Sequence, residues 1–237
     1  MRTSERHQLK QDRFAETTKD TISWAVENRN VLVWAVTTIV VVAVIFLGSM
    51  WYWEYRNQQA NTALGKAMDD YSAELRPAGT PANPEVKSFE SAEQRSRAAQ
   101  SGFQEIARRY GHTSAGKVAR YMAALTAIDL GDPNAAEQEL KQVAASGGKN
   151  ISSQAKLVLA GLYHNTNRDA EAVELYKDLL QHPTDLIPPS NVQLNLGATY
   201  EAMKLPVEAS KLYVQIIKAD QNTPAAEVAQ QRLMAIK

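Results

Sequence analysis

The chain has 237 residues, 44% of them hydrophobic, which suits one membrane segment and one globular domain rather than two large cores. Lys and Arg number 26 and Asp and Glu also number 26, so no overall field attracts nucleic acid or a strongly acidic ligand. The absence of cysteine excludes disulfides, thiolate nucleophiles, cysteine-based zinc sites and a lipid-modified cysteine.

Residues 1–30 form a leader with charges of both signs and no Pro or Gly. We expect this leader to be a short tail whose first dozen residues are partly disordered. A weak apolar stripe (Leu9, Phe14, Ile22 and Trp24) would also allow it to lie on a membrane surface.

An uncharged stretch of 24 residues follows, between Arg29 and Glu54. As a helix rising ~1.5 Å per residue, it is long enough to cross a hydrocarbon layer of ~30 Å. We therefore predict a transmembrane helix over Val31 to Trp53, in contact with the lipid bilayer. Its distal end is aromatic and offers no small-residue cleavage site, so we expect it to stay attached. More Lys and Arg precede it than follow it, which favours a cytoplasmic N-terminus.

Residues 54–87 are predicted to form a juxtamembrane helix and a proline-rich connection. The helical part either prolongs the span or begins the next domain. The connection, RPAGTPANPEVK over residues 76–87, contains three prolines and reads as flexible. No segment outside the span alternates apolar and polar residues over strand length, so we expect no sheet.

Residues 88–237 contain a repeated pattern of small and large residues. LAGLYHNTNRDAEAVELY, from Leu159 to Tyr176, and LGATYEAMKLPVEASKLY, from Leu196 to Tyr213, match at five positions with identical spacing. A weaker copy, AALTAIDLGDPNAAEQEL, stays in register upstream. The residues expected in the core of these units are Leu159, Tyr163, Ala172, Tyr176, Leu196, Gly197, Tyr200, Ala209 and Tyr213. This pattern resembles the tetratricopeptide repeat (TPR), a pair of helices of about 34 residues.

Helix-capping residues and prolines in this region indicate where helices begin. Asp132 and Thr223 each precede a proline, which is typical of a helix N-terminus, and Ser190 with Gln193 has the spacing of a capping box. The predicted fold class is therefore all-α, with an N-terminal transmembrane helix followed by a TPR α-solenoid.

The segment GHTSAGKV, from Gly111 to Val118, has the glycine and lysine spacing of a phosphate-binding loop. Such a loop requires a preceding strand and a Ser or Thr directly after the Lys, whereas here Val118 follows Lys117 and the preceding segment is helical in period. We interpret Gly111 as the end of one helix, with Thr113 or Ser114 capping the next.

No other motif indicates chemistry. The four histidines show no pairing at one-turn spacing, and the serines lack a nucleophile-elbow setting. We predict no catalytic residue, no cofactor, no metal and no small-molecule substrate. An enzyme or sensor with a hidden site is retained as a minor alternative.

The remaining candidate for function is the surface of the repeats. In stacked helix pairs the first helices line a concave wall that binds peptides or partner helices. Candidate partner-binding residues beside the repeat tyrosines are Tyr121, Gln154, His164, Asn165, Asn191 and Glu201. The alternative is ordinary polar surface, or packing between units for Tyr121.

A charged tail, one uncleaved span and a degenerate repeat array resemble the ancillary subunit of the bacterial Sec translocon. This resemblance implies a single-pass protein of the bacterial inner membrane with a periplasmic repeat domain. It also implies a non-catalytic scaffold whose partners are translocon subunits, periplasmic chaperones or client polypeptides in protein export. The alternative is a scaffold for envelope assembly or for coordinating cell division.

Overall fold

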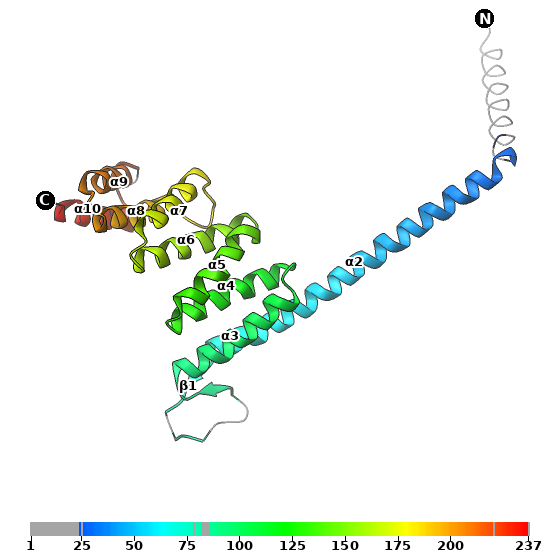
Figure 1. The fold of residues 1–237 in the computed structure, drawn as a ribbon, viewed down its shortest axis with the longest axis horizontal. Helices are drawn as coiled ribbons and strands as arrows, with labels where there is room; N and C mark the ends of the chain where they lie inside the picture. Colours follow the sequence, from blue (N-terminus) through cyan, green and yellow to red (C-terminus); the bar gives the residue numbers. More distant parts are fainter. Residues whose placement is uncertain (1–23, 25, 78, 82–85, 220, 237) are drawn as a thin grey trace, which may run out of the picture. The chain divides into compact units, whose positions relative to one another are not determined.

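The computed structural model describes residues 24, 26–77, 79–81, 86–219 and 221–236. Most of the predicted tail, residues 1–30, therefore lies outside the described residues. The chain divides into two compact units, residues 1–55 and residues 56–237. Apart from two very short strands, the regular structure of the described residues is helical (Figure 1).

The first helix, α2, runs without interruption from Arg29 to Ser72. Its apolar part has no buried residue, and by length and composition it can cross a membrane or act as a signal sequence. The hydroxyls of Thr37 and Thr38 donate to the carbonyls of Val33 and Trp34 one turn earlier. These polar groups are therefore satisfied within the helix, as a lipid environment requires.

The second half of α2 packs against α3 (Ala92–Arg109). Ala60 and Ala67 are buried in the same cluster as Phe103, and the rings of Tyr71 and Phe103 meet edge to face with centroids 6.2 Å apart. A Cβ atom added at Gly102 would lie 3.3 Å from the Cβ of Ala67, so small residues set this close approach. The residues after Glu54 therefore continue the apolar helix without interruption and also pack against α3.

The proline-rich connection is closed at its neck by two short parallel strands, β1 (Glu74–Leu75) and β2 (Ser88–Phe89). The expectation of no sheet is therefore wrong at this point, because strands of two residues are too short to show alternation. Arg76 supports the neck: its guanidinium donates to the carbonyls of Thr80 and Ser88 and forms an ion pair with Glu90 at 2.6 Å.

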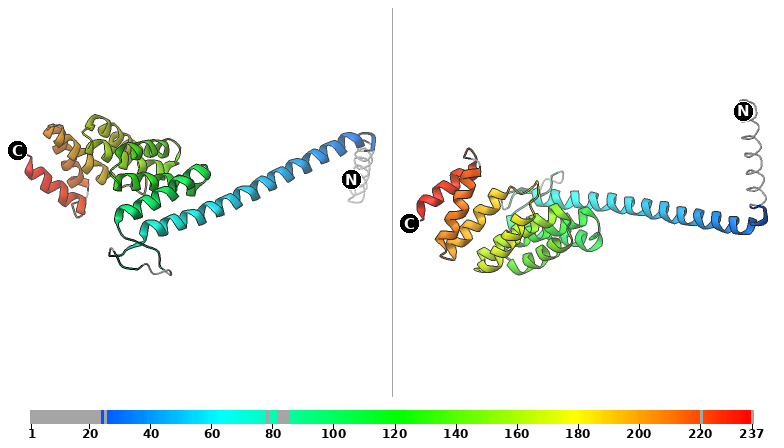
Figure 2. Two further views of the ribbon diagram at one scale, coloured as in Figure 1. Left: turned by 60° about the horizontal axis from the view of Figure 1, so that its bottom comes forward. Right: turned by 90° about the horizontal axis from the view of Figure 1, so that it is seen from above.

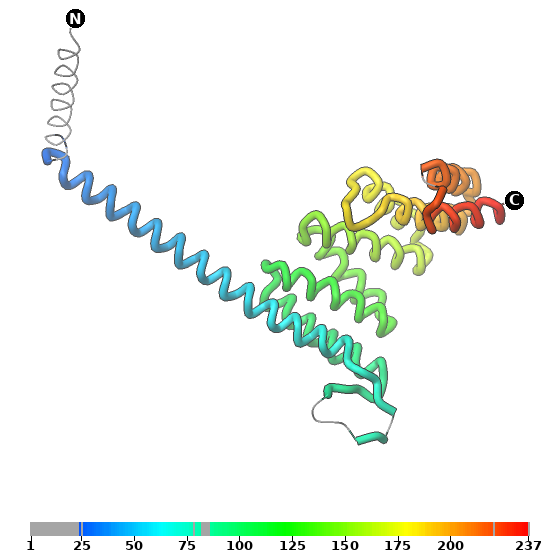
Figure 3. The backbone as a smooth tube through the Cα atoms, turned by 180° about the vertical axis from the view of Figure 1, so that it is seen from behind, coloured from blue at the N-terminus to red at the C-terminus, as the bar shows by residue number. Residues whose placement is uncertain are grey.

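Residues 114–236 form the helices α4 (Ser114–Asp129), α5 (Pro133–Ser146), α6 (Lys149–Asn165), α7 (Asp169–Gln181), α8 (Pro189–Ala202), α9 (Pro206–Ala219) and α10 (Pro224–Ala235). Helices α4/α5, α6/α7 and α8/α9 are successive hairpins, and α10 follows the last of them (Figures 1 and 2). The tube view shows each hairpin lying beside its neighbour within this unit (Figure 3).

The repeat positions supply the core of the array. One cluster extends from α4 to α8 and includes Leu140, Leu159 and Tyr176, while a second joins α8, α9 and α10 around Tyr213. Of the nine expected core residues, Tyr200 alone is only partly buried, and it packs against both clusters.

The predicted caps have mixed outcomes. Asp132 and Thr223 accept hydrogen bonds from the backbone N–H groups of Ala135 and Ala226, as expected of N-caps. The capping box at Ser190 is wrong, because α8 begins at Pro189 and Pro188 occupies the cap position. The fixed φ of proline suits the first helical turn, so α8 starts two residues earlier than a cap at Ser190 predicts.

Candidate functional site

The loop that resembles a phosphate-binding motif is the turn between α3 and α4. Thr113 accepts a hydrogen bond from the N–H of Gly116 at 3.0 Å and caps α4. Both glycines have packing reasons: a Cβ at Gly116 would overlap the carbonyl group of Tyr110, and one at Gly111 would lie 2.7 Å from the carbonyl oxygen of Ala107. The glycine spacing thus reflects close backbone contact between two helices.

The six predicted partner-binding residues lie on the first helices of the hairpins: Tyr121 on α4, Gln154, His164 and Asn165 on α6, and Asn191 and Glu201 on α8. Tyr121 is only half-exposed and packs against the main core cluster, and this burial raises the pKa of its phenol. The Tyr121 side chain therefore packs between repeat units, which is the alternative interpretation of this residue.

Three of the six residues have side-chain amides that form no hydrogen bond within the described part of the chain. Asn165 and Asn191 are exposed and Gln154 is half-buried. An amide side chain carries two donors and an acceptor, so these groups can bond a partner without breaking an internal contact.

His164 and Glu201 are instead engaged within the array. His164 Nδ1 lies 2.6 Å from Asp169 Oδ1 across the turn between α6 and α7. Glu201 accepts a hydrogen bond of 2.5 Å from the Tyr213 hydroxyl and forms an ion pair with Arg232 at 3.3 Å. Burial, reinforced by the bond to Glu201, raises the pKa of Tyr213. These two residues join helices, and a partner would compete with those contacts.

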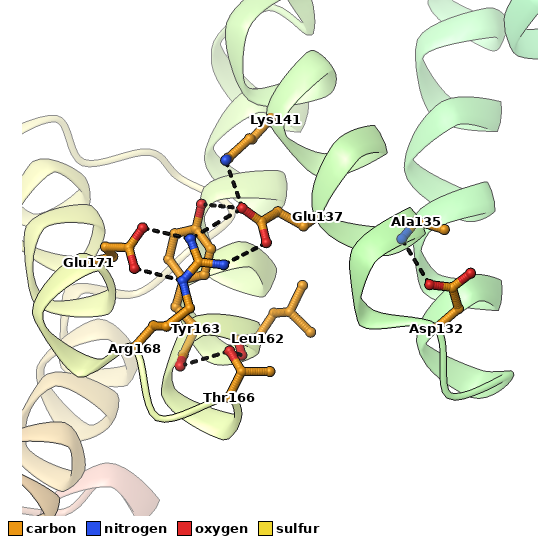
Figure 4. Close-up of polar contacts among 9 residues, drawn as sticks. All are labelled: Asp132, Ala135, Glu137, Lys141, Leu162, Tyr163, Thr166, Arg168 and Glu171. Atoms are coloured by element: carbon orange, nitrogen blue, oxygen red, sulfur yellow. Dashed lines mark hydrogen bonds and ion pairs between the residues drawn. The ribbon is translucent and has the colours of Figure 1, made fainter.

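A charged network that the sequence did not reveal connects α5, α6 and α7 (Figure 4). Arg168 forms ion pairs with Glu137 and Glu171, each at 2.6 Å, and its guanidinium lies 4.1 Å from the centroid of the Tyr163 ring. Lys141 pairs with Glu137 at 2.6 Å, and the Tyr163 hydroxyl donates to the same carboxylate at 3.2 Å.

Hydrogen bonds from Arg168 and then from Lys141 lower the pKa of Glu137 to about 2. The carboxylate therefore stays charged over the physiological pH range and holds three helices in one arrangement. Arg168 and Glu137 are 31 residues apart, so no local motif indicates that they meet.

Hollows on the surface of the second unit were also not predicted, and two of them differ in their lining residues. The larger, about 620 Å³, is mainly apolar and is lined by residues of α9 together with Ile236. The smaller, about 400 Å³, is called the basic hollow below. Its lining residues are Ala107, Arg108, Arg109, Gly111, His112, Lys117, Arg120, Gln142, Val143 and Ser146.

Comparison with known proteins places this geometry in context. The model of the tetratricopeptide repeat-like domain family matches residues 23–183, the apolar helix included. No curated protein matches the chain.

Among solved structures, the nearly identical TPR-like repeats of a kinesin light chain-type protein from Podospora anserina superpose with a TM-score of 0.52 at 17% identity. That match covers 61% of this chain and 79% of the other. YrrB, described as a TPR protein with an unusual peptide-binding site, gives a TM-score of 0.46 at 17% identity, over 59% of this chain and 71% of its own. Since the family model spans more than half of the sequence, the chain belongs to the tetratricopeptide repeat-like family.

Proposed function

We propose that this protein is a membrane-anchored scaffold for protein–protein interaction in the bacterial envelope, ancillary to the Sec translocon and to periplasmic chaperones in protein export. Residues 31–53 are the anchor, the N-terminus is cytoplasmic and the repeats are periplasmic. TPR-like repeats generally mediate protein–protein interaction, and the proposed scaffold has no catalytic role.

The observation that carries this proposal is the exposed apolar stretch of α2 joined to a repeat array. The side chains of Val42, Ile45 and Phe46 are 59%, 65% and 64% exposed. At roughly 25 cal/mol per Å² of apolar surface, such a stretch is unfavourable in water, and a bilayer would cover it. The repeats then remain attached to the membrane surface.

The proposed binding face includes the uncommitted amides of Gln154, Asn165 and Asn191. Gln154 and Asn165 lie on α6 and Asn191 lies on α8, and the first helices of stacked hairpins form a surface that suits an extended peptide or a partner helix. Their role as partner contacts stays a prediction that crosslinking can test directly.

The test is site-specific photo-crosslinking in living cells. A photoreactive amino acid replaces Asn165 or Asn191 in the full chain, and the matched control carries it at Gln138, an exposed residue on the second helix α5. We expect the two first-helix positions to capture a translocon subunit or a periplasmic chaperone, and the control to capture neither.

Capture of cell-wall synthesis or outer-membrane assembly proteins instead would favour the envelope-assembly alternative. Equal capture from all three positions would contradict the proposed face. The orientation has its own test: in intact spheroplasts an added protease should digest residues 60–237, and their protection would overturn the periplasmic assignment.

A further inference from the structure

The basic hollow concentrates positive charge in a chain with no net charge. Four of its lining residues are Arg or Lys and a fifth is His112, while none of the described lining residues carries a carboxylate. The cations come from the end of α3 and from the first two turns of α4. Their arrangement around one concave surface therefore favours an anionic group.

The four cations of the hollow differ in how far they are engaged. Arg120 is engaged with Glu139 at 3.4 Å and with Gln142, and Arg109 lies over the ring of Tyr110 at 5.5 Å. Arg108 and Lys117, in contrast, form no ion pair or hydrogen bond through their side chains within the described residues. Their charges are available to a ligand.

One lining residue of this hollow contacts Arg56, which follows the end of the proposed anchor, Trp53, by three residues in the chain. The Arg56 guanidinium donates to the backbone carbonyl of Arg109 and lies 5.4 Å from the centroid of the Tyr110 ring. Arg56 follows Trp53 by three residues in the uninterrupted helix α2, which is an advance of about 4.5 Å along the axis. The headgroup layer on each side of a bilayer is about 5–8 Å thick, which is comparable to this advance.

We propose that the basic hollow binds the phosphate group of an anionic phospholipid at the surface of the membrane that holds α2. The inference rests on the proposed function, since it needs residues 31–53 to be embedded. An acidic protein segment would satisfy the same charges. The membrane is favoured because Arg109, which lines the hollow, contacts Arg56, and Arg56 lies three residues beyond the end of the proposed anchor in the chain.

The phospholipid contact restrains the repeats beside the bilayer surface through a second attachment. Its strength depends on charge and on salt, because exposed ion pairs with headgroups are screened. Each basic residue near an anionic surface strengthens attachment by roughly fivefold.

The test measures how close the hollow lies to lipid headgroups in the full chain. Because the protein contains no cysteine, Ser146→Cys at the rim of the hollow can be labelled with a single fluorophore. The labelled protein is reconstituted into nanodiscs of phosphatidylcholine, alone or with about one third phosphatidylglycerol, that carry a trace of headgroup-nitroxide lipid. We expect stronger quenching in the anionic nanodiscs, and we expect added salt to reduce it.

The decisive variant is the double substitution Arg108→Gln with Lys117→Gln, which should reduce the ratio of bound to free hollow by roughly 25-fold. The matched control, Lys204→Gln with Lys218→Gln, removes the same charge from exposed residues that have no ion pair within the described chain. It should leave the quenching unchanged. Far-UV circular dichroism checks that both variants fold.

Equal quenching in neutral and anionic nanodiscs, or equal quenching by the two double variants, would overturn the proposal. If inorganic phosphate alters the label at matched ionic strength while phosphatidylglycerol does not, the hollow takes a soluble phosphate and the lipid assignment is wrong. Carbonate extraction distinguishes a failure of the proposed anchor from a failure of the proposed lipid site. A chain that is extracted refutes the anchor, whereas an embedded chain with lipid-independent quenching refutes the hollow alone.

Discussion

Adding a single methyl group at either of two glycines of the repeats should produce opposite changes in stability. Gly197 on α8 faces the buried ring of Tyr213 on α9, and a Cβ there would lie 2.6 Å from Cε1 and 2.8 Å from Cζ. Carbon atoms normally approach to ~3.5–4.0 Å, so in Gly197→Ala the ring has to move by about 1 Å. At Gly161 on α6, no atom from outside the local helix backbone lies within 4 Å of the same position, so Gly161→Ala fits without displacement.

The magnitude follows from three contributions to the free energy of unfolding. Overpacking at Gly197→Ala costs about 1–3 kcal/mol, and displacement of Tyr213 weakens its hydrogen bond to Glu201, which contributes about 1 kcal/mol. The gain in helix propensity from Gly to Ala offsets about 1 kcal/mol. The net destabilisation is about 1–3 kcal/mol. Gly161→Ala retains only the propensity gain and should stabilise by about 0.5–1 kcal/mol.

The assay is urea unfolding of the full chain in detergent micelles, followed by far-UV circular dichroism. With a slope of about 2 kcal/mol per M, Gly197→Ala should lower the midpoint by about 0.5–1.5 M and Gly161→Ala should raise it slightly. A Gly197→Ala protein as stable as the wild type would refute the close contact between α8 and α9. A Gly161→Ala protein that is equally destabilised would show that position on the helix face does not govern the effect.

Two further predictions concern the charged network and the anchor. Glu137→Gln should lower unfolding stability by about 1–2 kcal/mol at neutral pH, because its carboxylate accepts from Arg168 and Lys141. Since the pKa of Glu137 is lowered from 4.5 to about 2, this contribution is present above pH 4.5 and disappears as pH falls towards 2, where variant and wild type should unfold alike. Val42→Arg should raise the free energy of membrane insertion by ~2.5–3.5 kcal/mol and reduce the share of the protein found in the membrane, whereas Val42→Leu should change neither. Carbonate extraction followed by immunoblotting measures the membrane-bound share of each variant. Full retention of the Arg variant in the membrane would contradict a span.

The repeats could be predicted from the sequence because their spacing records helix contacts directly. Leu196, Gly197 and Tyr200 repeat the pattern of Leu159, Ala160 and Tyr163, and Gly197 lies directly against Tyr213 on the second helix of its own hairpin. Within one hairpin, small residues occur where the two helices cross and large residues fill the contact between them. This pattern is visible in a short stretch of sequence. It therefore predicts the hairpins without any knowledge of distant contacts.

Contacts between distant residues could not be predicted in this way. The ion pair of Arg168 with Glu137 depends on how one hairpin stacks on the next, and Arg168 precedes α7 without any motif of its own. His164 and Glu201 also form contacts within the chain that the sequence did not indicate, although Asp169 is only five residues from His164 and Tyr213 twelve residues from Glu201. Contact of these two residues with a partner stays a prediction.

The basic hollow and the neck of the proline-rich connection were missed for related reasons. The cations of the hollow are divided between the end of one helix and the start of the next, so neither helix alone carries a basic face that would indicate a site. The strand pair involves only Glu74–Leu75 and Ser88–Phe89 and is held by Arg76, which has no periodic signature.

The shared use of α2 determines where the protein can be divided for work in solution. Ala60 and Ala67 cover α3, so a fragment starting at the natural-looking boundary near Ser88 would leave Ala99 and Phe103, both 0% exposed at present, in water. Exposing an aromatic side chain of this size to water lowers the free energy of unfolding by about 1.5–3 kcal/mol. A soluble expression fragment should therefore begin at Arg56, directly after the aromatic end of the apolar stretch, and retain the whole amphipathic remainder of the helix.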